Sequence, residues 1–217
     1  MEISFKKYLL SAAIGFGIGG AIWGGILYSW IPDIDYPLNI VGILVGLFGG
    51  IGLSIFSKNI KQILKVSGFG LLGSMIGFIV AFFGIYHLGI LGRVPYISPW
   101  FLFFSSYAWD ELTILEPHLS TSDYWLNFAL AGIFIGLFLA IAFKIKIWSL
   151  VWRGGVGFGL GALVGPVIGN LIGNLFNSLL VSYLITFSVI GIVLGLFLAW
   201  GIYVNSKNQK SKIKITN

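Results

Sequence analysis

The sequence predicts an all-α integral membrane protein that crosses the bilayer about six times. Apolar and aromatic residues make up 58% of the 217 residues, whereas charged residues make up only 9%. Soluble domains carry about a quarter charged residues, so a water-soluble fold would lack a polar shell. The apolar residues also gather in long runs, and the mean hydropathy is +0.99. Lipid is therefore the expected solvent.

Each apolar run approaches the roughly 20 residues that a helix needs to cross the hydrocarbon core. The predicted spans are 8–30, 39–56, 63–91, 124–143, 147–169 and 178–204. The first run follows two lysines as in a signal peptide, but it is too long and lacks a small-residue cleavage site. We expect one transmembrane domain, 1–217, whose residues 205–217 form a basic cytoplasmic tail.

The charges alternate from one connection to the next, and this pattern predicts the orientation. Lysine and arginine are retained on the cytoplasmic side during insertion. With six spans, twelve of the thirteen basic residues lie on one side, and only Arg93 lies on the other. Six of the seven acids accompany Arg93: Asp33, Asp35, Asp110, Glu111, Glu116 and Asp123. We therefore expect both termini in the cytoplasm and the protein in the cell (inner) membrane.

Two glycine patterns alternate along the chain and predict an internal repeat. Gly-Phe-Gly begins at Gly15, Gly68 and Gly157, early in the odd-numbered spans. Gly-x-x-x-Gly-Leu-Phe fills 42–48, 132–138 and 191–197 in the even-numbered spans. The chain thus resembles one helical hairpin used three times in parallel, around an axis along the membrane normal. The units are about 8–56, 63–143 with an outer insertion at 93–123, and 147–204.

In several spans, glycines recur every fourth residue and leave one face of the helix without side chains. This is the spacing of a glycine zipper. In lipid, small residues on one face let helix backbones approach closely. We interpret these glycines as helix-packing residues; a homo-oligomer contact and a narrow pore lining are the alternatives. They are Gly42, Gly46, Gly50, Gly132, Gly136, Gly157, Gly161, Gly165, Gly169, Gly173, Gly191 and Gly195.

The fifth span carries a proline and a stripe of amides. Pro166 removes a backbone donor from the helix, and Asn170, Asn174 and Asn177 follow near one helical face. The stripe is a candidate for contact with a small polar solute or a cation. Amides also join neighbouring helices in membranes, and we favour this second interpretation.

The outer loop contains an aromatic segment and scattered metal-binding residue types. Residues 100–115 follow Ser98-Pro99, a helix-capping pattern, and their aromatic residues predict an interfacial helix. His87 and His118 lie among the outer acids at spacings that match no metal motif. We predict neither a metal site nor a cofactor.

These observations favour a non-catalytic membrane subunit or assembly protein, packed through its glycine-rich faces. Charged residues are absent from the middle of the spans, where proton relays and ion pathways place them. The expected partners are membrane lipids and other membrane subunits or a second copy, and not nucleic acid. The alternatives are a transporter or channel for a small or apolar solute and, third, a lipid-acting membrane enzyme. No catalytic residue is assigned, and the chain has no cysteine.

Overall fold

The computed structural model describes residues 5–30, 42–57, 59–86 and 121–215, all of which are helical or belong to short connections. The side chains at Trp30, 82–86, 121–124 and 208–215 are not described. The α-helices are α1 (Phe5–Trp30), α2 (Ile43–Ser54), α3 (Ile60–Tyr86), α5 (Thr121–Phe143), α6 (Ile147–Leu175) and α7 (Leu179–Ile215). A 3₁₀ turn, η1 (Ile55–Ser57), follows α2.

Five of these helices are long and apolar enough to cross a membrane: α1, α3, α5, α6 and α7. The predicted class, a helical multi-pass integral membrane protein, is therefore confirmed. The predicted second span, 39–56, appears as α2 with η1, which is apolar but shorter than the other five. Its residues 39–41 lie outside the described part of the chain.

Two helices are longer than the apolar runs that predicted them. α6 continues to Leu175 instead of ending at residue 169, and α7 continues to Ile215 instead of ending at residue 204. The basic segment 205–217, predicted as a tail, is thus helical through Ile215. The predicted boundaries followed hydropathy, whereas Asn, Gln, Ser and Lys can extend a helix beyond the apolar part.

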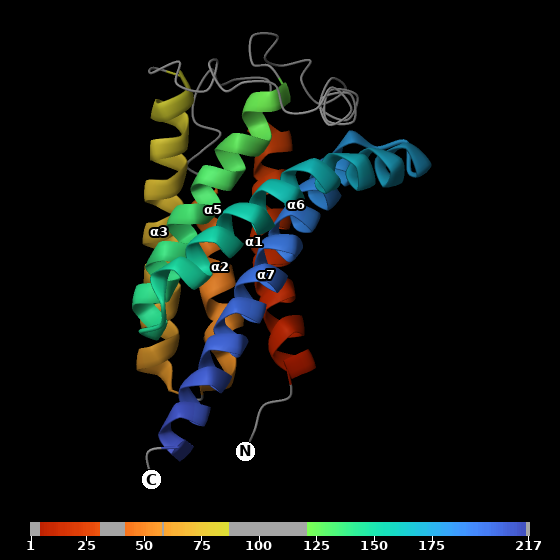
Figure 1. Ribbon diagram of the computed structural model, residues 1–217. Coiled ribbons are helices and arrows are strands. Elements are labelled where there is room, and N and C mark those ends of the chain that lie inside the picture. The colour runs from red at the N-terminus through yellow and green to blue at the C-terminus, as the bar shows by residue number, and fades with distance from the viewer. Residues whose placement is uncertain (1–4, 31–41, 58, 87–120, 216–217) are drawn as a thin grey trace.

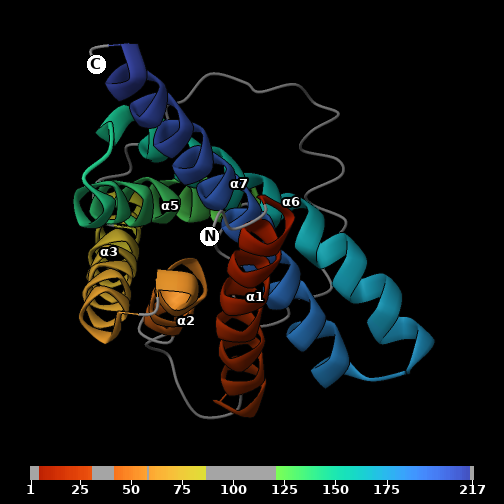
Figure 2. The ribbon, with the colours of Figure 1, turned by 90° about the horizontal axis from the view of Figure 1, so that it is seen from below.

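The helices form a ring in which each packs against its neighbours in the sequence. α1 contacts α2, α2 contacts α3, and the series continues through α5, α6 and α7. α7 then packs against α1 and closes the ring. Figure 1 shows α3 nearly upright, while α6 and α7 lean across the bundle, and Figure 2 shows where they join, well away from α2 and α3.

Two tight turns set the direction of α6. Lys144 and Asn177 adopt left-handed backbone conformations, with φ of 54° and 48°. In each turn the next residue donates to a carbonyl five residues earlier: Ile145 N to Ala140 O at 3.1 Å, and Ser178 N to Gly173 O at 2.9 Å. This is the hydrogen bond of a Schellman helix end. It ends α5 and α6 sharply, so that the following helix turns back beside the one before it.

Candidate functional site

Aromatic side chains fill the interior of the ring. Trp23 of α1 is 3% exposed, and its ring centroid lies 4.6 Å from that of Phe187, 5.1 Å from Phe78 and 5.5 Å from Phe128. Phe158 of α6 completes the group, 5.1 Å from Phe128 and 5.9 Å from Phe78. These spacings are typical of favourable aromatic pairs. We call these five residues the aromatic cluster; it joins α1, α3, α5, α6 and α7.

The glycines of α1, α3 and α6 bring each of these helices close to the helix that follows it. A Cβ atom added to Gly19 would lie 2.8 Å from the carbonyl oxygen of Leu44 in α2. One on Gly77 would lie 2.8 Å from the Ala131 oxygen in α5, and one on Gly161 2.7 Å from the Ile190 oxygen in α7. Real Cβ atoms do not approach backbone so closely, because packed interiors resist added volume.

The glycines of α2, α5 and α7 face the next helix in the ring. A Cβ on Gly46 would overlap Gly70 of α3, one on Gly132 would overlap Gly154 of α6, and one on Gly191 would overlap Phe16 of α1. The other predicted packing residues, Gly42, Gly50, Gly136, Gly157, Gly165, Gly169, Gly173 and Gly195, also face a neighbouring helix. Close backbone approach of this kind provides dispersion contact where lipid supplies no hydrophobic drive.

The predicted amide stripe lies along the α6–α7 pair. Pro166 is buried inside α6, and the helix continues past it. Asn170 faces α7, where its Oδ1 accepts a hydrogen bond of 2.8 Å from the Ser182 hydroxyl. Asn174 and Asn177 are exposed at the end of the pair. Of the predicted stripe, Asn170 therefore joins two helices, whereas Asn174 and Asn177 lie on the surface.

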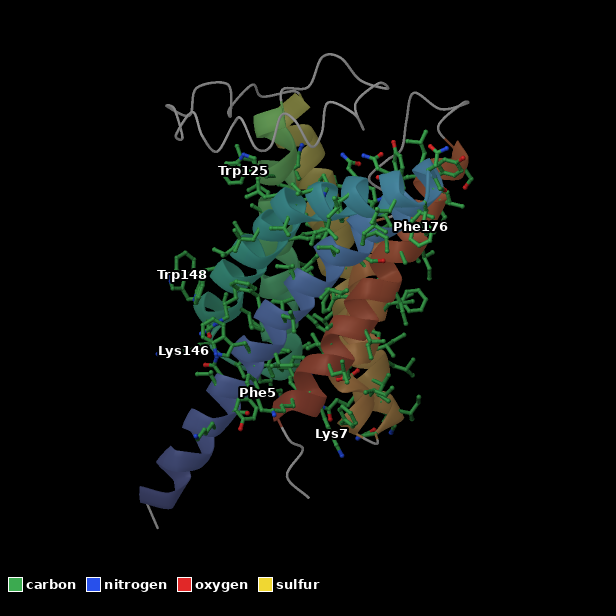
Figure 3. All side chains as sticks on the ribbon, turned by 90° about the vertical axis from the view of Figure 1, so that its right-hand side faces the viewer. Phe5, Lys7, Trp125, Lys146, Trp148 and Phe176 are labelled. Carbon is green, nitrogen blue, oxygen red and sulfur yellow. The ribbon has the colours of Figure 1, made fainter. Side chains whose placement is uncertain are left out.

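The end of the α6–α7 pair projects from the bundle and is apolar. We call residues 170–181 the arm. Phe176 at its turn is 70% exposed, and Figures 1 and 2 show the turn between α6 and α7 at the edge of the molecule. Figure 3 looks toward this side and labels Phe176. The other large apolar residues exposed here are Leu171, Leu175, Leu179 and Leu180. Among the described residues, none forms a side-chain hydrogen bond with the Asn174 amide.

A buried arginine lies near the other end of α6. Arg153 is 9% exposed, and its Cζ lies 4.6 Å from the ring centroid of Trp152 and 4.7 Å from that of Trp200. Its Nη1 donates to the Ser149 carbonyl oxygen at 2.7 Å and to the Ser149 hydroxyl at 2.5 Å. Asn205 of α7 donates to the same hydroxyl at 2.6 Å. Indole faces attract a guanidinium electrostatically. The two indoles and Ser149 therefore surround the Arg153 guanidinium, and no carboxylate among the described side chains pairs with it.

Sequence reasoning missed this arrangement because it grouped Arg153 with the basic connection before α6. The guanidinium instead lies about two turns into the helix. The neighbouring Trp152 was the only local indication, since Trp200 and Asn205 come from a helix that follows much later in the chain. Their proximity depends on the packing of α6 against α7.

A groove opens on the outside of the ring between α5 and α6. Its volume is about 400 Å³, and every lining residue is aromatic, aliphatic or glycine. Trp125 of α5 lies at one end and Trp148 of α6 at the other (Figure 3). Gly155 and Gly159 form part of its lining next to Ile133 and Ala129 of α5. At these two positions α6 lies close to α5: a Cβ atom on Gly155 would lie 2.9 Å from Ile133 Cγ1, and one on Gly159 3.3 Å from Ala129 Cβ.

The outer-loop candidates lie outside the described part of the chain. They are His87, His118, Asp33, Asp35, Asp110, Glu111, Glu116 and the aromatic segment 100–115. Asp123 belongs to the first turn of α5, but its side chain is not described. Among the described residues, no three His, Asp or Glu side chains come together in a way that could hold a metal ion.

The architecture defines a polytopic helical membrane protein with a filled interior. No family model, no curated protein and no solved structure matches the chain.

Proposed function

We propose that the protein is a non-catalytic membrane subunit or assembly protein that packs against a partner through the arm. The observation that carries this proposal is the exposure of the arm's apolar residues together with the amides of Asn174 and Asn177. Amides in membranes form hydrogen bonds between helices. A partner helix along α6 would accept or donate these bonds while covering Leu171 and Leu175.

The interior of the bundle supports a packing role over transport. A solute pathway along the ring axis would have to pass the aromatic cluster, whose members touch one another across five helices. The glycine contacts also bring neighbouring backbones too close for a wide aqueous space between them. A transporter would need both features to rearrange.

A threefold arrangement of hairpins is part of the same proposal. The hairpins would be α1 with α2, α3 with α5, and α6 with α7. In each, glycines of the first helix face the second, as Gly19, Gly77 and Gly161 do. The Gly-x-x-x-Gly face of each second helix then meets the next hairpin, as Gly46, Gly132 and Gly191 do. Other glycines of the first helices, Gly20, Gly70 and Gly154, face the preceding helix, as a closed ring requires. The same use of both glycine sets in all three hairpins supports the internal repeat.

The proposed orientation places both termini in the cytoplasm of a cell that carries the protein in its inner membrane. Because the chain has no cysteine, single-cysteine variants report accessibility without background labelling. In intact cells an impermeant maleimide is expected to label Asp35→Cys and Glu111→Cys, and to spare Lys61→Cys and Lys207→Cys until the membrane is opened. We expect this result because lysines are retained on the cytoplasmic side during insertion, while the acid-rich connections lie on the other side. Labelling of Lys207→Cys from outside would reverse the orientation.

The arm itself is tested by cross-linking in native membranes. Phe176→Cys, labelled with benzophenone maleimide and irradiated, is expected to give one defined adduct by insertion into a C–H bond of the partner, because a partner covers this side chain. A second copy would add about the mass of one chain, 23.7 kDa, and mass spectrometry identifies any other subunit. Leu72→Cys on α3 is the matched control, since it is also exposed but lies outside the arm. An identical adduct from the control, or none from Phe176→Cys in a monomer of native mass, contradicts the proposal.

A further inference from the structure

The groove between α5 and α6 has the dimensions of a lipid chain. Along α6 its lining runs from Trp148 to Leu163, a rise of about 22 Å at 1.5 Å per residue. One leaflet of the hydrocarbon core is about 15 Å thick, half of the usual 30 Å. An acyl chain lying obliquely in one leaflet therefore matches the groove in length, and its methylene groups match the apolar lining.

Positive charge lies at one mouth of this groove. Lys144 and Lys146 are exposed in the turn that joins α5 to α6, the two helices that line the groove. Trp148 follows directly, and Figure 3 shows Lys146 and Trp148 toward the same end of the molecule. Tryptophan favours the depth of the headgroups. At the opposite mouth, the first turn of α5 before Trp125 contains no lysine or arginine in its sequence.

Arg153 adds to the charge at the same end. It lies against Trp152, whose indole lines the groove. The guanidinium is therefore separated from the groove by one aromatic ring, and its Nε has no hydrogen-bond partner among the described residues. Its charge contributes to the positive potential at the mouth without touching the occupant.

We propose that this groove is a binding site for an anionic glycerophospholipid. One acyl chain lies along Gly155 and Gly159, and the phosphate lies at Lys144 and Lys146. The groove has lysines at one mouth and an uncharged, apolar lining. It therefore favours a molecule with one anionic end and one apolar end. An apolar helix of a partner would fill the groove without using the lysines. This site is separate from the arm and does not depend on the proposed function.

Native mass spectrometry of the full chain, released from nanodiscs, measures which lipid stays bound to the protein. The nanodiscs contain equal amounts of phosphatidylglycerol and phosphatidylcholine, which differ in headgroup charge and share acyl chains. The wild-type protein is expected to retain phosphatidylglycerol preferentially. Lys144→Gln with Lys146→Gln is expected to reduce that preference about 25-fold, because each lysine near an anionic surface contributes about a factor of five. Lys6→Gln with Lys61→Gln is the control, since both lysines are exposed and the charge change is the same.

A second variant pair tests the acyl chain separately from the charge. Val156→Phe, at an exposed lining position, is expected to fill the groove and abolish lipid retention, whereas Val164→Phe, equally exposed on the same helix but outside the lining, leaves it unchanged. Glycerol phosphate and inorganic phosphate, added instead of lipid, are expected not to be retained. Equal retention of both lipids by wild type, no effect of Val156→Phe, or a groove occupied by a second copy would each overturn the proposal.

Discussion

Trp23→Ala is expected to lower the thermal midpoint of the detergent-solubilised protein by about 10 °C. Truncating a buried Trp or Phe costs roughly 3–5 kcal/mol, and 1 kcal/mol corresponds to about 2–4 °C in a chain of this size. Trp23 is the centre of the aromatic cluster, in contact with residues of α3, α5 and α7. Removing the indole leaves a cavity whose walls belong to several helices, so no single side chain can refill it.

The measurement is the loss of the monodisperse peak in size-exclusion chromatography after heating. Trp148→Ala is the matched control, because its indole is 76% exposed and its removal leaves no internal cavity. We expect the control to stay within a few degrees of wild type. Equal midpoints for the two variants would show that the aromatic cluster does not hold the ring together. Bound lipid stabilises the protein it occupies, so both variants are compared in lipid-free detergent.

Gly70→Ala is expected to destabilise the protein by roughly 1–3 kcal/mol or more, the usual effect of overpacking. A methyl group on Gly70 would overlap the carbonyl oxygen of Gly46, and a methyl group on Gly46 would overlap that of Gly70. Both obstacles are backbone atoms, so α2 and α3 can accommodate the methyl group only by moving apart. The same heating assay should show a midpoint lower by several degrees.

Gly68→Ala provides a control two residues away on the same helix. A Cβ at this position meets no atom within 4 Å. Alanine is favoured over glycine in a helix by roughly 0.5–1 kcal/mol, so this variant should match or slightly exceed wild type. If Gly68→Ala and Gly70→Ala behave alike, backbone approach at Gly46 and Gly70 is not what positions α2 against α3.

The sequence predicted the helices better than it predicted their ends. Hydropathy locates α1, α3, α5, α6 and α7 because lipid requires long continuous apolar runs. It cannot locate the ends of α6 and α7, where Asn, Ser and Lys extend the helix. Among the predicted spans, 39–56 agrees least with the structure, since α2 and η1 are together shorter than the other helices. A short helix can still belong to the ring because Gly46 and Gly50 let it lie close to α3.

The candidate sites were less predictable, because they depend on which helices meet. Glycine spacing indicated the packing faces, since a period of four places residues on one side of a helix. The position of Arg153 against the rings of Trp152 and Trp200 depends on the contact of α6 with α7. The aromatic cluster draws phenylalanines from positions that share no sequence spacing. The groove combines Trp125, Ala129 and Ile133 of α5 with residues of α6, so it depends on how these two helices pack.

The length of α7 has a consequence for the basic segment at its end. With 37 residues, the helix is about 55 Å long at 1.5 Å per residue, well beyond the roughly 30 Å of hydrocarbon it has to cross. Its last turns carry Lys207, Lys210, Lys212 and Lys214. Because α7 is helical through Ile215 while its apolar span ends at Lys207, this basic segment continues the direction of the helix and does not begin a separate chain segment at the end of the apolar part.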